Sequence, residues 1–200
     1  MIQIKNAAEL EKMRKACAIS AAALKAGGEA IESGITTAEI DKIIYDFIVR
    51  HGARPNFLHL YGFPATACIS VNDTVIHGIP NRQQQIRPGD IVSIDTGCKI
   101  DGFNGDNACT YGCGKLDLEA QRLLDVTKES LHRGIEMARG GNRIGDISHA
   151  VQEYVEENGF SVVRSFVGHG VGKELHEDPA VPSVGNAGRG PRLVPGMCSG

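Results

Sequence analysis

The chain has 200 residues, of which 42% are apolar and 22% charged, and its net charge at pH 7 is −3. These values are typical of a single soluble globular domain. An acidic balance without a Lys/Arg-rich run argues against a nucleic-acid partner, and no apolar stretch reaches the roughly 20 residues that span a bilayer. The six cysteines form no CxxC pair and the N-terminus is polar, so reduced thiols and a cytoplasmic location are expected.

The first predicted helix begins near Ala7. Asn6 and Glu9 stand in the positions of a capping box, and apolar residues then recur at roughly helical spacing. Because glycine is a poor helix former, this helix is expected to end before Gly27-Gly28.

A second helix is predicted within residues 36–52. Thr36 and Glu39 form its capping pair, and Gly52 is its stop. One face is strongly apolar and is expected to be buried; it consists of Ile40, Ile43, Ile44, Phe47 and Ile48.

After Pro64 the pattern changes from helices to strands. The segments TACISV (66–71) and TVIHGI (74–79) are predicted to be extended, and residues 90–112 to form a hairpin around an Asp101-Gly102 turn. The remaining elements are expected as helices at about 118–139 and 146–158, strands from Phe160, and a surface loop at 186–196.

The order helix, helix, strands therefore occurs twice. Residues 34–52 and 141–159 align without gaps at an offset of 107, and the same offset places Pro88-Gly89 on Pro195-Gly196. Chance similarity between two amphipathic helices is the alternative explanation for the first match taken alone. The repeat predicts an α/β (α+β) fold made of two related halves, each with two helices and an antiparallel sheet.

The repeat also predicts the domain organisation. Residues 1–200 are expected to form one catalytic domain, with a first half of about 1–112 and a second of about 113–200. On this register the equivalent of Asp95 falls at position 202. The last strands of the second half are therefore expected to be missing from these residues.

Two aspartates on the predicted hairpin are the first candidates for chemistry. With a two-residue turn, Asp95 pairs with Ala108 and Gly97 pairs with Asp106, so both carboxylates share one sheet face at a backbone distance of roughly 7–8 Å. Carboxylates that close repel each other unless they are protonated or bridged by cations. A pair of divalent metal ions is one interpretation, and two solvated turn residues are the other.

Three histidines are the next candidates. His169 lies in GHGVG with His176 seven residues further on, and His77 precedes a glycine near a probable strand end. Histidine serves both as a metal ligand and as an acid or base, whereas a lone histidine is more often structural.

Three segments, SIDTGCKIDGFNGD, FVGHGVGKELHEDP and VNDTVIHGIP, together resemble the type I methionine aminopeptidases. The resemblance covers the whole chain and implies the pita-bread metallopeptidase fold, with two pseudo-symmetric halves. It also implies a metal-dependent hydrolase that removes the N-terminal methionine from nascent proteins and peptides.

The resemblance implies a role for each candidate. Asp95, Asp106 and His169 would be ligands of two divalent metal ions, while His77 and His176 would contact the peptide near the scissile bond. The methionine side chain would enter a pocket formed by Cys68, Phe63, Phe57 and Leu175. A ligand set rich in carboxylates favours Mn, Fe or Co, with Zn as an alternative.

The family completes its metal site with two glutamates further along the chain, the first of which belongs at position 202. A chain that ends at Gly200 would lack both carboxylates. It is therefore expected to be a C-terminally incomplete form whose activity is lost or strongly reduced.

Two alternatives to this function stay open. One is a relative of the same fold that is directed to Xaa-Pro peptides, and the other is a non-catalytic module of this fold that binds peptides or proteins. The expected partner is a peptide or nascent-chain N-terminus, with docking on the ribosome left open. The protein is expected to be a monomer with no membrane or nucleic-acid partner.

Overall fold

The computed structural model describes residues 1–200, and the chain divides into two compact units. Unit 1 comprises Met1–Ala7, Leu118–Gly172 and His176–Gly200; unit 2 comprises Ala8–Asp117 and Lys173–Leu175. No helix in either unit is long and apolar enough to cross a membrane. The assignment of the whole chain to one catalytic domain stays a prediction.

Helix α1 (Ala7–Glu29) begins where the sequence predicts, but its predicted end is wrong because the helix continues through both glycines. A Cβ on Gly27 would lie 2.7 Å from Ile44 Cδ1, and one on Gly28 would lie 2.2 Å from Tyr111 Cζ. These glycines therefore permit close packing of the helix against its neighbours, which outweighs their low helix propensity.

Helix α2 (Thr37–Arg50) has the predicted capping box, in which the Glu39 amide donates to Thr36 Oγ1 and the Thr36 amide donates to Glu39 Oε2. Gly52 follows the helix with φ of +73°, a conformation that glycine adopts without strain. Of the predicted stripe, Ile40, Ile44 and Ile48 are fully buried, and Phe47 packs against the same core.

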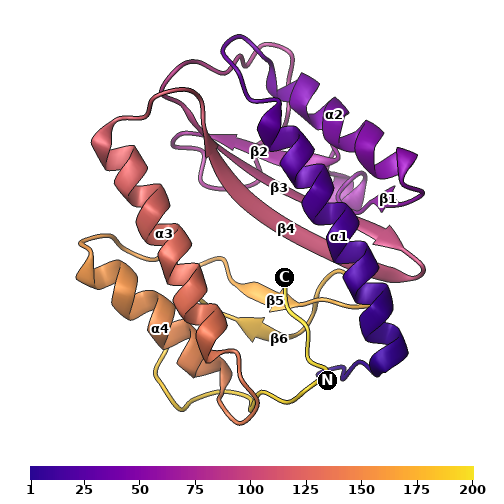
Figure 1. Cartoon of the computed structure of the whole chain (residues 1–200), viewed down its shortest axis with the longest axis vertical. Coiled ribbons are helices and arrows are strands. Elements are labelled where there is room, and N and C mark those ends of the chain that lie inside the picture. Colours follow the sequence, from indigo (N-terminus) through magenta and orange to yellow (C-terminus); the bar gives the residue numbers. More distant parts are fainter. The chain divides into compact units, whose positions relative to one another are not determined.

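A four-stranded antiparallel sheet forms the rest of unit 2. Strand β3 (Ile91–Ile100) pairs with β1 (Arg54–Pro55), β2 (Ala67–Val71) and β4 (Phe103–Gly112), and a short 3₁₀ helix, η1 (Leu60–Gly62), links β1 to β2. Figure 1 shows α1 crossing this sheet, and Ser20 Oγ donates to Thr96 O at 3.0 Å. Because side chains alternate along a strand, Asp95 points to the opposite face of the sheet from Thr96.

The extended segment predicted at 74–79 is wrong, because no strand forms there. His77 has φ of +55°, in the left-handed region, which cannot continue a pleated ladder. Gly78 instead runs beside β2, where Ile69 N donates to Gly78 O at 2.9 Å.

Unit 1 contains a helix pair and a small sheet. Helices α3 (Leu118–Met137) and α4 (Ile144–Glu157) pack closely enough that a Cβ on Gly134 would lie 2.9 Å from Val151 Cγ2. Strand β5 (Gly168–Gly170) pairs with β6 (Glu177–Val181). The strand predicted from Phe160 is therefore wrong for its first eight residues, which form turns and irregular structure.

The repeat predicted from the sequence appears in the main-chain hydrogen bonds. Helices α2 and α4 both have 14 residues, and their starts differ by the predicted offset. Corresponding bonds hold each helix start to a later segment of the same unit: Thr37 N to Gln84 O matches Ile144 N to Pro191 O, and Gly34 N to Ile86 O matches Gly141 N to Leu193 O. The two units thus contain the same helix-and-loop arrangement.

Candidate active site

The hairpin of β3 and β4 places the two aspartates as the sequence predicts. Asp95 lies opposite Ala108 and Gly97 lies opposite Asp106, with Asp101 and Gly102 at the turn. Asp101 and Gly102 have φ of +51° and +84°, as a type I′ hairpin turn requires. Asp95 and Asp106 are therefore diagonal neighbours on one face of the sheet.

Burial and charge both act on this pair. The pKa of Asp95 is raised to about 7, first by burial and then by the charge of Asp106. No cationic side chain of unit 2 contributes to lowering it. A carboxylate in this position is stabilised either by a proton or by a metal cation.

The site residues fit a divalent metal ion. Carboxylate oxygens are ligands for hard divalent cations, and a bound cation would offset the repulsion between the two neighbouring negative charges. Within either unit, no group of three or more His, Cys, Asp or Glu side chains gathers in a way that could hold a metal. The aspartate pair would therefore supply only part of a ligand set.

Cys68 lies directly opposite Asp95 on strand β2. Its thiol is buried, and burial, followed by the charges of Asp95, Asp106 and Asp41, raises its pKa to about 12. The thiol therefore stays protonated at neutral pH and acts as a small apolar group rather than as a nucleophile.

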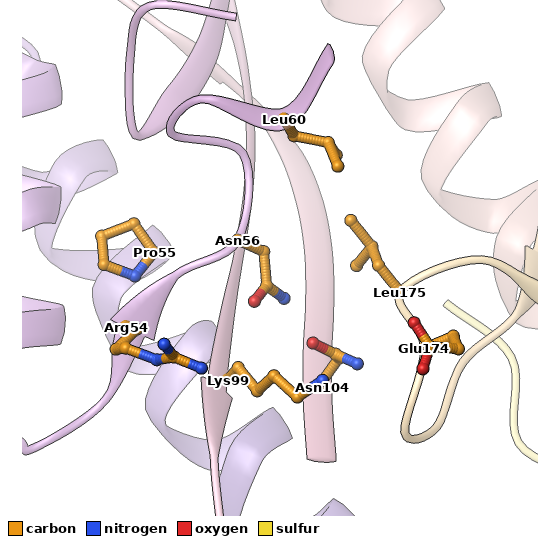
Figure 2. Close-up of a pocket in the computed structure, with 8 residues that line it drawn as sticks. All are labelled: Arg54, Pro55, Asn56, Leu60, Lys99, Asn104, Glu174 and Leu175. Atoms are coloured by element: carbon orange, nitrogen blue, oxygen red, sulfur yellow. The ribbon is translucent and has the colours of Figure 1, made fainter. Parts of the chain in front are cut away.

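Of the three other predicted pocket residues, Phe57 lies near the carboxylate pair. Phe57 is buried, and its Cε1 lies 3.4 Å from the position of a Cβ on Gly97, the residue opposite Asp106. Phe63 is half-buried at the end of η1, where its amide donates to Leu60 O. Leu175 lines a cavity together with Leu60 (Figure 2).

His77 is exposed and precedes Gly78, which is tied to β2 beside Cys68. A Cβ on Gly78 would lie 2.2 Å from Ile69 O, so only glycine allows this approach of the chain to the strand. The left-handed conformation of His77 is thus fixed by packing, as is frequent at functional sites.

The remaining two histidines lie together in unit 1. His169 on β5 and His176 just before β6 have ring centroids 4.5 Å apart in an edge-to-face arrangement. His169 Nδ1 lies 3.0 Å from Gly170 O. If Nδ1 carries the proton that this bond uses, Nε2 is left as the nitrogen that can bind a metal or accept a proton.

An antiparallel hairpin with two neighbouring carboxylates, one of them with a raised pKa, on a chain with a repeated helix-and-loop arrangement is typical of an enzyme site. Residues 11–199 match the model of metallopeptidase family M24, and the chain belongs to that family.

Two similar proteins illustrate the match. The chain is 52% identical over 197 residues to a methionine aminopeptidase of Clostridium perfringens, an alignment that covers 98% of this chain and 79% of the relative. It superposes on the crystal structure of a methionine aminopeptidase from Thermotoga maritima with a TM-score of 0.96 and 42% identity, covering 98% of this chain and 79% of that one. The pita-bread fold expected from the sequence is confirmed.

More distant proteins share the fold alone. The prolidase from Pyrococcus furiosus matches with a TM-score of 0.80 at 23% identity, covering 98% of this chain and 59% of that one. This likeness carries no information about the substrate.

Several polar residues on the face of the carboxylates were not predicted from the sequence. Figure 2 shows a cavity in unit 2 whose lining includes Asn56, Lys99 and Asn104. The predicted hairpin register could have identified two of them. Lys99 pairs with Asn104, and side-chain alternation places both on the face of Asp95 and Asp106.

Proposed function

We propose that this chain hydrolyses the first peptide bond of peptides that begin with methionine, with the help of divalent metal ions. The main supporting observation is that Asp95 and Asp106 share one face of the β3–β4 hairpin, where burial and the charge of Asp106 raise the pKa of Asp95. Relatives at 41% to 52% identity that are methionine aminopeptidases support the choice of substrate.

We propose that Asp95, Asp106 and His169 hold two divalent ions, with Mn, Fe or Co preferred and Zn as the alternative. Such ions, when bound, act as a Lewis acid and lower the pKa of a bound water. The carboxylates would fix the cations on the sheet face, and the hydrogen bond at His169 Nδ1 would orient Nε2.

The other two histidines are proposed to act on the peptide. His77 and His176 would contact it beside the scissile bond. An imidazole N–H there would donate to the carbonyl oxygen as negative charge develops on it, which lowers the barrier to attack.

The methionine side chain is proposed to lie against Cys68, Phe63, Phe57 and Leu175. A protonated thiol, two aromatic rings and a leucine give an apolar pocket with polarizable sulfur, which suits an unbranched thioether. A charged or β-branched first residue would lose this contact.

We propose a monomer in the cytoplasm that acts on peptides and on nascent chains, including those still at the ribosome. The acidic net charge and the free thiols support this location, and nucleic acid is not an expected partner.

The test is release of methionine from Met-Ala-Ser by protein loaded with Mn²⁺, with a chelator as the control. The assay is also run on the chain continued past Gly200 with the corresponding segment of the Clostridium perfringens relative, since the repeat predicts a further carboxylate at position 202. Chelator-sensitive release in either form supports the proposal. Cleavage of Ala-Pro-Ser in preference to Met-Ala-Ser would favour the Xaa-Pro alternative, and tight Mn²⁺ binding with no cleavage of either peptide would favour the binding module.

A further inference from the structure

A cavity of about 270 Å³ lies in unit 2 on the same sheet face as the two aspartates. Strands β1, β3 and β4 form one side of it, and the loop at 173–175 forms the other (Figure 2). None of the roles proposed above uses its polar lining.

The cavity adjoins the carboxylate pair directly. Asn104 precedes Asp106 by two residues on β4, so the two lie roughly 7 Å apart along the strand. Asn56 bridges the gap, since its Nδ2 lies 3.1 Å from the position of a Cβ on Gly97, the residue opposite Asp106. An extended peptide advances about 3.3 Å per residue, so a peptide with its first bond at the pair reaches Asn104 with its third residue.

The cavity is held open by hydrogen bonds. Lys99 Nζ and Asn104 Nδ2 both donate to Lys173 O, at 2.6 Å and 3.0 Å. This carbonyl fixes the loop that carries Glu174 and Leu175. The wall formed by Leu60 and Leu175 is therefore in place before any ligand binds (Figure 2).

The donors in the cavity exceed the acceptors. Asn56 Nδ2 is buried and has no hydrogen-bond partner in the protein, which is costly unless a ligand supplies an oxygen. Arg54 is exposed and forms no ion pair, and Lys99 is bonded to a carbonyl rather than to a carboxylate. Against these two cations the lining contains a single acid, Glu174.

We propose that this cavity binds the third residue of the substrate peptide and prefers a carboxylate there. Arg54 and Lys99 attract the negative charge, and Asn56 Nδ2 donates to an oxygen of the bound peptide. This inference rests on the proposed function, because it places the cleaved bond at Asp95 and Asp106.

The test compares three amidated peptides, Met-Ala-Asp-Ser, Met-Ala-Asn-Ser and Met-Ala-Lys-Ser, as substrates of the metal-loaded protein. A charge-assisted contact at a partly exposed site is expected to lower KM for the Asp peptide about threefold to tenfold relative to the Asn peptide, with kcat little changed. The Lys peptide is expected to have the highest KM.

Arg54→Gln removes a cation that has no partner in the free protein, so the fold is expected to persist. The variant should lose most of the Asp preference, measured as the ratio of the KM values for Met-Ala-Asn-Ser and Met-Ala-Asp-Ser. Arg50→Gln, an exposed charge change on α2 outside the cavity, is the matched control and should keep the preference.

A second measurement does not need turnover. Metal-free protein labelled with ¹⁵N is titrated with N-acetyl-aspartate amide and, separately, with N-acetyl-asparagine amide. Shifts of the Asn56 and Asn104 side-chain amides that are larger with the aspartate probe support the proposal. Equal KM values for the three peptides, or equal shifts with both probes, overturn it while leaving the proposed function intact; a failure to cleave any peptide counts against the function instead.

Discussion

Lys5 Nζ lies 2.6 Å from Glu177 Oε2, and the two side chains are only 4% and 8% exposed. This buried ion pair joins the N-terminal segment of unit 1 to strand β6, directly after His176. The Lys5 amide also donates to Gly196 O at 2.8 Å. The first residues of the chain are thus held against strand β6 and the turn at Gly196.

Lys5→Met is expected to lower the free energy of unfolding by about 3–5 kcal/mol, because it removes the cation that neutralises the buried Glu177 carboxylate. Urea unfolding monitored by circular dichroism measures the change. The double variant with Lys5→Met and Glu177→Leu should recover most of the loss, since no buried charge remains.

The matched control for this experiment is Lys173→Met. Lys173 pairs with Glu9 at 2.9 Å, but the lysine side chain is 66% exposed, so its loss should cost about 1 kcal/mol or less. A Lys5 variant as stable as this control would contradict the importance assigned to the buried pair.

Asp95→Asn is expected to separate activity from stability. Loss of a proposed metal ligand should reduce methionine release at least about 100-fold, since even partners of the ligands are worth 10-fold to 100-fold. In chelator, the free energy of unfolding should stay equal or rise, because the buried charge beside Asp106 is gone.

Asp101→Asn at the hairpin turn is the control for that experiment. Asp101 is exposed and pairs with Lys15 at 2.7 Å on the surface, so its replacement should leave both quantities nearly unchanged. A large loss of metal-free stability in Asp95→Asn would show that the pair is structural.

The raised pKa of the Asp41 carboxyl is expected to make the free energy of unfolding depend on pH. Burial raises the pKa of its carboxyl, and hydrogen bonds from the Ala67 and Thr66 amides oppose this more weakly. With a folded pKa above the unfolded value, the folded state binds the proton more tightly, so stability from this group is greatest below about pH 4 and is lost as pH rises through the folded pKa.

Asp41→Asn keeps an oxygen for the two amides and removes the titration. Its stability relative to the original protein should therefore be more favourable at pH 7 than at pH 4, measured by urea unfolding at both values. Asp73→Asn, at an exposed turn position, should show no such difference.

Gly89 and Gly196 occupy equivalent positions in the two halves of the repeat. Gly89 and Gly196 have φ of +93° and +94°, so alanine is strained at both, by about 1–2 kcal/mol. No other group lies near a Cβ on Gly89, whereas a Cβ on Gly196 would lie 2.6 Å from Lys5 O. Gly196→Ala should therefore destabilise the protein more than Gly89→Ala in thermal unfolding, and equal losses would mean that the N-terminal contact is easily displaced.

The hairpin was predictable because its two-residue turn fixes the register, and the register places Asp95 and Asp106 on one face. The capping box of α2 was predictable for the same local reason. The end of α1 was not, because Gly27 and Gly28 serve contacts with Ile44 and Tyr111 that no local pattern reveals.

The long-range polar contacts could not be predicted from the sequence either. Lys5 and Glu177 are far apart in the sequence and look like ordinary surface residues until the fold buries them. The bounds of the short strand β6 were not predicted from the sequence, because its residues, EDPAV, contain a proline and two acids, which are rare in strands.

Cys68 is buried with a raised pKa, whereas Cys109 on β4 is exposed. Only the thiolate reacts readily with peroxides and alkylating agents, and a pKa of about 12 leaves roughly one thiolate per 100,000 molecules at pH 7. Oxidants are therefore expected to react with Cys109, on the edge strand β4, before they react with Cys68. The Cys68 thiol, opposite Asp95, would therefore stay reduced under mild oxidising conditions even without a reductant.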